Sequence, residues 1–204
     1  MATLINDPEL EERLKEQRRA WGADGHDEVW EGVYLMTPLP NDEHQEIVGE
    51  LASVLQDVVG WAGVGKVRAG VNLAGYGEDW THDYRVPDVA VFLHTGKAEN
   101  LDTHWRGPAD FLVEVVSRGD QSREKIPFYA RIGVRELLLV DRDPWTLELY
   151  RHRDGAMERV GQSTAIGGEV LVSQSVPLQF QLLPGEPRPR IYVTHPASGR
   201  GWSV

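Results

Sequence analysis

The sequence lacks cysteine, and it also lacks any long uninterrupted apolar run. Without cysteine, the chain can form no disulfide, no thiolate zinc site and no cysteine nucleophile. A helix that crosses a bilayer needs roughly 18 consecutive apolar residues, and the sequence offers no such run. The first residues are acidic and have no apolar centre, so they do not resemble a secretory signal. We therefore expect a cytoplasmic protein that does not insert into a membrane.

Several motifs of nucleotide-dependent and hydrolytic enzymes are missing as well. The chain contains no GxxxxGK[ST], GxGxxG, GxSxG or HExxH. This argues against kinases, P-loop NTPases, dinucleotide-binding enzymes, serine hydrolases with a nucleophile elbow, and zinc peptidases.

Basic charge is scarce and unevenly distributed. The formal net charge is −11, and residues 1–60 carry 14 acidic and 4 basic side chains, against 18 and 17 in residues 61–204. An acidic surface repels nucleic-acid phosphates. A local basic patch in the near-neutral later segment is still compatible with nucleic-acid binding, and composition alone does not decide the matter.

The apolar pattern indicates an α/β fold. Apolar residues three and four positions apart predict a helix at 42–59, which Asn41 or Asp42 would cap. A second helix is expected at 120–132, with Gly133 as its C-cap. Runs of β-forming residues predict a hairpin around Glu31-Gly32 and strands at 66–74, 85–93, 111–116, 135–141 and 146–151.

The length of 204 residues and the 41% of hydrophobic residues are typical of one globular domain with appendages. We expect an acidic helical appendage at 1–24 and a core with a mixed sheet at 25–155. The remaining residues, 156–204, are rich in proline and glycine and are expected to form a peripheral extension, partly strand and partly irregular.

One acidic residue interrupts the most apolar predicted strand. Glu114 lies within the run Phe-Leu-Val-Glu-Val-Val, and an ionised carboxylate is costly to bury without a partner. Val113 and Val115 would point to the opposite face of the strand. Glu114 either points to solvent at the end of the strand or carries out a function inside the protein, and this residue alone leaves both interpretations open.

A second acid, Asp88, follows Pro87 and starts the apolar run 89–93, which comes before the Glu114 strand in the sequence. Two carboxylates on neighbouring strands repel each other unless a proton or a cation lies between them. Mg²⁺ prefers oxygen ligands and is often held by one or two carboxylates with water. The backbone carbonyl of Val115 is a plausible further ligand. The pair therefore suggests a metal site that can bind a phosphate oxygen and activate water.

Three basic residues follow Glu114 in the sequence. Lys125 would orient a water molecule or neutralise charge that develops on a phosphate, although a solvated helix lysine is the more common situation. Arg118 and Arg123 would contact phosphates, and an exposed helix face explains them equally well.

Together these residues resemble the Uma family of bacterial endonucleases in the PD-(D/E)XK, restriction-endonuclease-like superfamily. The resemblance spans roughly residues 25–155. It rests on the following segments, in this order: Glu28-Val29-Trp30-Glu31-Gly32, His44-Gln45, Pro87-Asp88, Glu114-Val115-Val116-Ser117, Lys125-x-x-x-Tyr129, Gly133-Val134-Arg135-Glu136 and Leu139-Val140-Asp141.

The resemblance implies a mixed sheet of four to five strands flanked by helices. It also implies that Asp88 and Glu114 ligate Mg²⁺ or Mn²⁺. The superfamily lysine normally stands two residues after the second acid, where this chain has Val116, so its role passes to Lys125. His44 or Glu31 would complete the site.

The chain departs from the family pattern directly after the acidic strand. The family commonly has Ser-Pro there, whereas this chain has Ser117 followed by Arg-Gly-Asp. This difference changes the loop beside the expected site and leaves the three principal residues in place.

The implied function is metal-dependent hydrolysis of nucleic-acid phosphodiester bonds, as in an endodeoxyribonuclease. DNA is the expected partner, and a homodimer could cut both strands. Two alternatives stay open. One is a catalytically inactive binding or oligomerisation module on the same fold, which the acidic net charge favours. The other is an enzyme that acts on a different phosphate ester.

Overall fold

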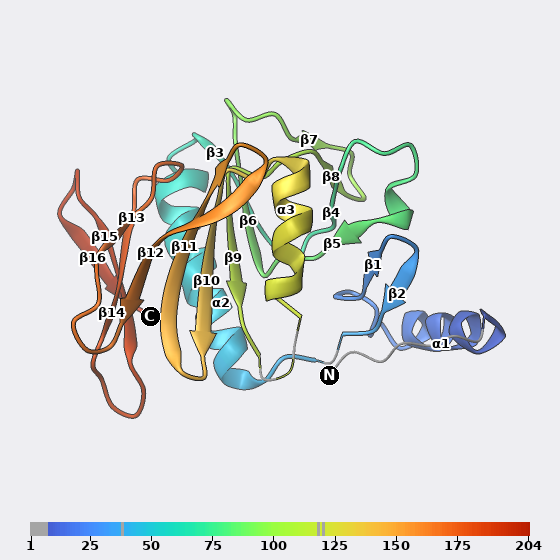
Figure 1. Ribbon diagram of the computed structural model, residues 1–204, viewed down its shortest axis with the longest axis horizontal. Helices are drawn as coiled ribbons and strands as arrows, with labels where there is room; N and C mark the ends of the chain where they lie inside the picture. Colours follow the sequence, from blue (N-terminus) through green and yellow to red (C-terminus); the bar gives the residue numbers. More distant parts are fainter. Residues whose placement is uncertain (1–7, 38, 118, 120) are drawn as a thin grey trace.

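The structure, a computed structural model, describes residues 8–37, 39–117, 119 and 121–204. Its centre is a six-stranded mixed sheet with helices α2 and α3 on opposite faces (Figure 1). The strand order is β12-β11-β10-β9-β6-β3, in which β9 and β10 are parallel and the other neighbours are antiparallel. The strands are β3 (Gly65–Ala69), β6 (Val89–Leu93), β9 (Phe111–Val115), β10 (Glu136–Arg142), β11 (Trp145–Arg153) and β12 (Ala156–Thr164).

The alternation of side chains along β9 divides the core in two. Phe111, Val113 and Val115 face the α2 side, whereas Leu112 belongs to the cluster that packs on α3. All five residues of β9 are buried, as the almost continuous apolar run predicts for a central strand. Glu114 follows the alternation and faces α3 with Leu112.

The helices begin and end where their sequences supply caps. Helix α2 (Asp42–Leu55) begins after Asn41, whose side chain accepts a hydrogen bond from the N–H of His44, and it continues as a π-helical turn at Gln56–Gly60. The expected helix at 120–132 is shorter in the structure: a 3-10 turn at Arg123–Lys125 precedes α3 (Ile126–Ile132). Pro127 has no N–H to donate and is therefore confined to the start of α3. Gly133 ends α3 with a φ of 86°, which confirms the predicted cap.

Two predicted strands are each divided between two sheets. The segment 66–74 forms β3 and β4 (Leu73–Ala74), and 85–93 forms β5 (Tyr84–Arg85) and β6. Gly70 breaks the first with a φ of 57°, and Pro87 breaks the second because it cannot donate to a ladder. Asp88 consequently lies where the chain crosses from one sheet to the next.

The second sheet contains the N-terminal hairpin and short strands from the loops. Its order is β2-β1-β5-β4-β8-β7. Besides β4 and β5 it contains β1 (Glu28–Trp30), β2 (Val33–Leu35), β7 (Glu99–Asn100) and β8 (Trp105–Arg106). A short 3-10 turn, Trp80–His82, precedes β5. The pairing of Val29 with Tyr84 brings the hairpin to the end of the central sheet. Helix α1 (Pro8–Ala20) lies beside the hairpin at the edge of the molecule (Figure 1).

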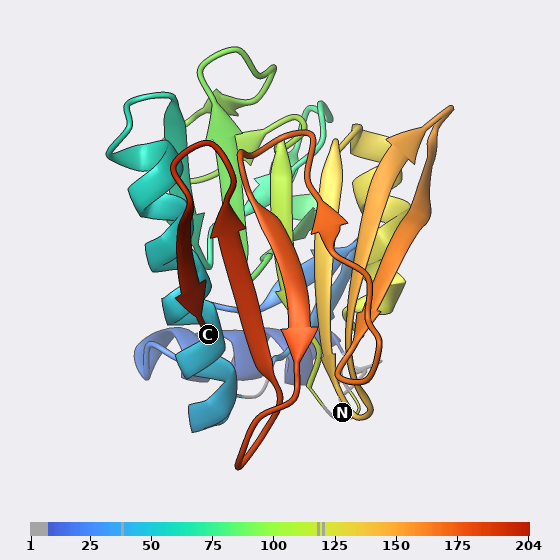
Figure 2. The same ribbon diagram turned by 90° about the vertical axis from the view of Figure 1, so that its left-hand side faces the viewer.

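The C-terminal residues form more ordered structure than the sequence suggested. Strand β12 belongs to the central sheet, so that sheet extends beyond residue 155 and has six strands rather than four to five. A four-stranded antiparallel sheet follows, with β13 (Leu171–Val172), β14 (Gln179–Leu183), β15 (Arg190–His195) and β16 (Arg200–Ser203) (Figure 2). Phe180 of this sheet stacks on Phe111 at 5.7 Å between ring centroids. The extension therefore closes the α2 side of the core.

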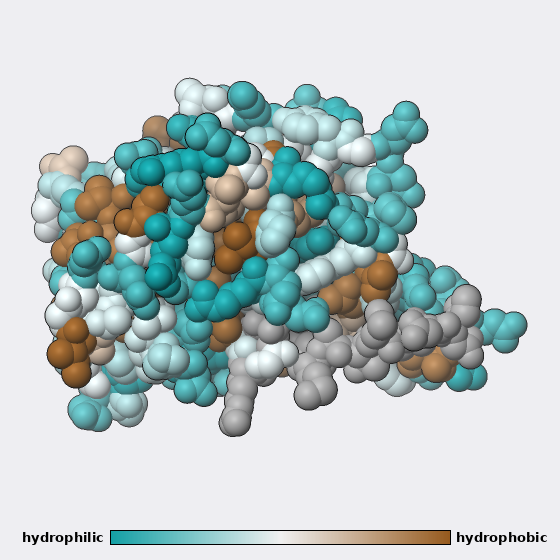
Figure 3. Space-filling view, in the orientation of Figure 1, coloured by the Kyte–Doolittle hydropathy of each residue, from teal (hydrophilic) through white to brown (hydrophobic). Residues whose placement is uncertain are grey.

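The surface in the orientation of Figure 1 is mainly hydrophilic, with apolar patches over the C-terminal sheet and over the hairpin β1–β2 (Figure 3). None of the helices in the described part of the chain is long and apolar enough to cross a membrane.

Candidate active site

A cleft of about 1020 Å³ opens where the hairpin, the start of α2, the end of β9 and the turn before α3 meet. The predicted acids and the predicted lysine all line this cleft. Its charged and histidine side chains are His26, Glu28, His44, Asp88, Glu114, Arg123, Glu124, Lys125, Asp141, Arg142 and Asp143.

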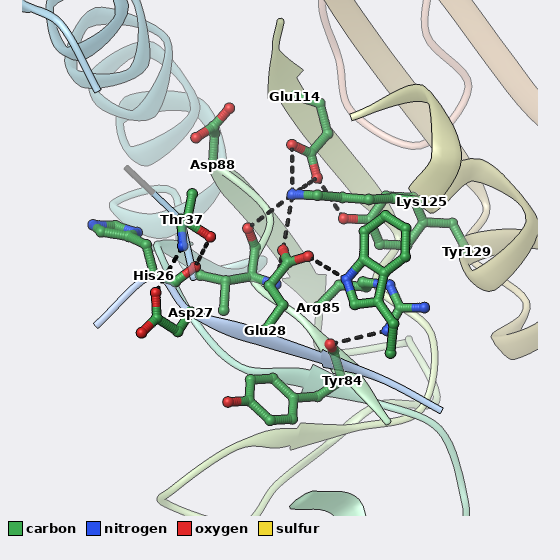
Figure 4. A network of polar contacts seen from close by, with 12 residues as sticks. His26, Asp27, Glu28, Thr37, Tyr84, Arg85, Asp88, Glu114, Lys125 and Tyr129 are labelled. Carbon is green, nitrogen blue, oxygen red and sulfur yellow. Dashed lines mark hydrogen bonds and ion pairs between the residues drawn. The ribbon is translucent and has the colours of Figure 1, made fainter. Parts of the chain in front are cut away.

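Glu114 is buried, with 1% of its surface exposed, so it does not point to solvent. Its Oε1 accepts a short hydrogen bond from the hydroxyl of Tyr129, which is one turn further along the chain than Lys125. The Lys125 ammonium lies 3.2 Å from Oε1 and 3.3 Å from Oε2 (Figure 4). The spacing Lys125-x-x-x-Tyr129 places both side chains on one face of the turn and helix, where they meet the same carboxylate.

Lys125 is not a solvated lysine. Its side chain is 13% exposed, and its ammonium also contacts Oε1 of Glu28 at 2.9 Å and the carbonyl of Val86 at 3.4 Å. Two carboxylates and one backbone carbonyl therefore surround the ammonium, which has three hydrogens to donate. Burial by itself would lower the pKa of Lys125, but Glu114, Glu28 and Asp88 outweigh it and hold that pKa above its ordinary value.

Burial raises the pKa of the Glu114 carboxyl to about 8, although the Lys125 ammonium and the Tyr129 hydroxyl both favour its ionised form. The carboxylates of Asp88 and Glu28 raise this pKa further. A cation next to Glu114 would reverse the balance, because opposite charge favours the ionised carboxylate.

Asp88 is fixed through one of its two oxygens. Its Oδ2 accepts the N–H of Val115 at 2.7 Å and lies 3.3 Å from Nε2 of His44. Within the described residues, no contact occupies Oδ1 of Asp88, and its side chain is 21% exposed at the cleft. Asp88 can therefore accept a further ligand.

Glu28 is the site residue that sequence reasoning missed. It is 4% exposed, and it comes from β1 rather than from the central sheet. Oε1 accepts the N–H of Val86 at 2.8 Å, and Oε2 accepts the indole N–H of Trp30 at 2.6 Å. The sequence signal for Glu28 is an acid at the start of the predicted hairpin, while the expectation fell on Glu31 in the adjoining turn.

The charge of the cleft favours a hard divalent cation. Glu28, Asp88 and Glu114 carry three carboxylates against the single ammonium of Lys125, which leaves two negative charges when all are ionised. Mg²⁺ or Mn²⁺ would balance these charges. In the described residues, no group of three or more histidine or acidic side chains is arranged so that it could hold a metal ion by itself. Two carboxylates completed by water suit Mg²⁺, which keeps several of its waters when bound.

The other residues predicted for the site are not shown to take part in it. Glu31 occupies a turn position with a φ of 50°, its side chain is 73% exposed, and it contacts Arg131 rather than the acids. Val115 contacts Asp88 through its N–H, and a role for its carbonyl stays a prediction. Arg118 lies outside the described residues. Arg123 lines the cleft, but its guanidinium contacts Asp141 at 2.8 Å and Glu148 at 2.5 Å.

Comparison with known proteins identifies the family of the chain. The sequence profile of the Uma2 family, described as "Putative restriction endonuclease", matches residues 11–185. This chain belongs to the Uma2 family. The Uma2 match extends beyond the expected core at both ends, so it includes most of α1 and part of the C-terminal sheet. No curated protein matches the chain.

A solved structure supports the same fold. The chain is similar to a "putative nuclease belonging to DUF820 from Anabaena variabilis", with a TM-score of 0.52 and 21% sequence identity over 65% of this chain and 75% of that one. The Uma2 chain therefore has the restriction-endonuclease-like α/β fold expected from its sequence. The description of the family supports a nuclease function.

Proposed function

We propose that this Uma2 protein is a metal-dependent endonuclease that hydrolyses phosphodiester bonds in DNA. In this proposal Asp88 and Glu114 hold Mg²⁺ or Mn²⁺, and Lys125 acts on the attacking water. The observation that carries the proposal is that Asp88, Glu114 and Lys125 line one cleft, where Lys125 and the buried Tyr129 both contact the Glu114 carboxylate.

The residues of the chain would divide the work. When bound, the metal supplies positive charge for the phosphate and a more acidic water. Asp88 keeps its orientation through the Val115 N–H, and His44 braces the same oxygen. Lys125 stays protonated among its carboxylates, so it orients water and stabilises negative charge on the phosphate rather than acting as a free base.

The dimer and the cellular location stay within this proposal. A C2 homodimer would present two clefts and could cut both strands of a duplex. Size-exclusion chromatography with light scattering at several concentrations measures the mass directly. A cytoplasmic location stays a prediction from the sequence.

A non-catalytic binding module is the second candidate. It is favoured by the net charge of −11 and by the ion pairs that engage Arg123, Lys125 and Arg142, the basic residues of the cleft within the described chain. Such a module would bind its partner without cleaving it, and it would need no metal.

The decisive experiment compares wild type with Asp88→Ala on supercoiled plasmid and on single-stranded DNA, with Mg²⁺, Mn²⁺ or EDTA. We expect nicking of the plasmid by wild type with metal, and none by Asp88→Ala. Calorimetric titration with Mn²⁺ should show binding to wild type that the variant loses. Cleavage that persists in EDTA or in Asp88→Ala would contradict the proposal, and metal-independent binding without cleavage would favour the binding module.

A further inference from the structure

We propose that Glu28 is a positioning residue that holds the Lys125 ammonium at the reacting end of the cleft, so that the N-terminal hairpin is part of the active site. This inference rests on the proposed nuclease function. It assigns a role to a carboxylate that lies outside the central sheet, to which Glu114 belongs and which Asp88 directly precedes.

The contacts of Glu28 require a carboxylate. Oε1 receives the Val86 N–H at 2.8 Å and the Lys125 ammonium at 2.9 Å, and Oε2 receives the Trp30 indole N–H at 2.6 Å. Both oxygens therefore act only as acceptors. A glutamine at this position would direct its NH₂ group against one of these donors, since an amide has a single acceptor oxygen.

The contact to Glu28 is the shortest that Lys125 makes. The ammonium is 2.9 Å from Glu28, compared with 3.2 and 3.3 Å from the oxygens of Glu114 and 3.4 Å from the Val86 carbonyl. Lys125 can therefore turn a hydrogen away from Glu114 toward water or phosphate while Glu28 retains the ammonium. A lysine stem has four rotatable bonds, so fixing its end removes motion that would otherwise slow the reaction.

The position of Glu28 is itself rigid. Strand β1 pairs with β2 on one side and with β5 on the other. The N–H of Val86, in the segment that links β5 to Asp88, binds Glu28 directly. Glu28 thus connects the hairpin, the Asp88 segment and the Lys125 turn. A group of buried charges of this kind gives little net stability by itself, which favours a functional reason for it.

The test uses Glu28→Gln with Glu136→Gln as a matched control. Glu136 is 1% exposed, accepts a guanidinium at 2.7 Å from Arg151 and several other hydrogen bonds, and does not line the cleft. The two variants undergo the same chemical change in similar burial. Thermal denaturation should first establish a temperature at which both variants are folded.

We expect Glu28→Gln to lower kcat about 100-fold while KM changes less than about threefold, since the lost function is alignment of a reacting group. Glu136→Gln should keep kcat within about threefold of wild type. Mn²⁺ binding by calorimetry should persist in Glu28→Gln and fall far less than in Asp88→Ala, because Glu28 contributes charge near the site but is not assigned as a ligand. Equal loss of kcat in both variants, or loss of metal binding in Glu28→Gln, would overturn the inference.

A second readout does not depend on activity. The chain has four lysines, so acylation of Lys125 by an N-hydroxysuccinimide ester can be followed by peptide mass spectrometry against the exposed Lys66 and Lys97. In metal-free wild type, Lys125 should react at least about 10-fold more slowly than these two, because it is protonated and buried. Glu28→Gln should accelerate its acylation about 10-fold, and Glu136→Gln should leave it unchanged.

The two readouts separate the inference from the proposed function. Absence of cleavage by wild type would refute the nuclease proposal, while acylation would still report whether Glu28 holds Lys125. Unchanged acylation of Lys125 in Glu28→Gln would refute the positioning role even if wild type cuts DNA.

Discussion

Oδ2 of Asp88 accepts the backbone N–H of Val115 at 2.7 Å, and this contact ties Asp88 to the strand that carries Glu114. Val115 directly follows Glu114 on β9, and Asp88 directly precedes β6. The pairing of Val89 with Val113 brings the next residue of each strand, Asp88 and Glu114, to the same end of the antiparallel pair. The spacing of the acids is therefore set by a strand ladder, which is more rigid than a loop.

Removal of the ammonium should separate chemistry from metal binding. We expect Lys125→Ala to lower kcat on plasmid DNA about 100-fold or more, because the group that orients water is lost. Mn²⁺ binding measured by calorimetry should remain, since neither acid of the metal pair is altered. Cleavage at the wild-type rate would show that Lys125 is not the migrated lysine of the superfamily.

The stability of the metal-free protein should fall as the pH rises from about 4.5 to about 8. Burial raises the pKa of Glu114 from 4.5 to about 8, so the folded protein retains a proton there that the unfolded chain has lost. The stabilisation is complete below the unfolded pKa and is lost through the folded one, by an amount on the order of a few kcal/mol. Urea denaturation at several pH values measures it.

Glu114→Gln provides the control for that pH series. The amide cannot titrate, so this variant should lose the part of the slope that comes from Glu114 while other groups continue to contribute. A wild-type slope that is identical in Glu114→Gln would mean that the carboxyl does not titrate in this range.

The ion pair between Arg18 of α1 and Asp27, which directly precedes the hairpin, should contribute measurably to stability. Arg18 contacts both oxygens of Asp27, at 2.5 and 2.6 Å, and Asp27 is 2% exposed. Arg18→Ala leaves this buried carboxylate without its cation and should lower the free energy of unfolding by about 2 kcal/mol. Arg19→Ala serves as the comparison, because Arg19 is 69% exposed and 4.0 Å from Asp24. Arg19→Ala should lower the free energy of unfolding by less than about 0.5 kcal/mol. An equally small decrease in Arg18→Ala would mean that the Arg18–Asp27 pair does not stabilise the protein.

Binding of DNA should depend only weakly on salt. The basic residues of the cleft that the structure describes are engaged by carboxylates, so few of them are available to replace counterions on phosphates. We expect the slope of log Kd against the logarithm of the salt concentration to be about 2 or less. Arg123→Ala should change this slope by less than about 0.5. Fluorescence anisotropy in Ca²⁺, without cleavage, measures both slopes. A decrease of about 1 in Arg123→Ala would instead show the phosphate contact that the sequence suggested.

Much of this protein is determined locally by its sequence. The periodicity of α2, the cap at Asn41, the positive φ of Gly133 and the buried run around Glu114 follow from neighbours within a few residues. The same local pattern identified Asp88, Glu114 and Lys125 as candidates. The restriction-endonuclease-like fold, in turn, was implied by the resemblance of these segments, in their order, to the Uma family.

Only the tertiary structure decided which acids meet. Glu28 and Glu31 are three residues apart in one hairpin, and local sequence does not distinguish a strand position that faces the cleft from a turn position that faces solvent. The C-terminal sheet depends likewise on long-range pairing and on the apolar face that the central sheet offers, neither of which shows in the proline- and glycine-rich sequence. Contacts between segments far apart in the chain, such as those that join Glu28, Val86, Glu114 and Lys125, are set by packing rather than by local propensity.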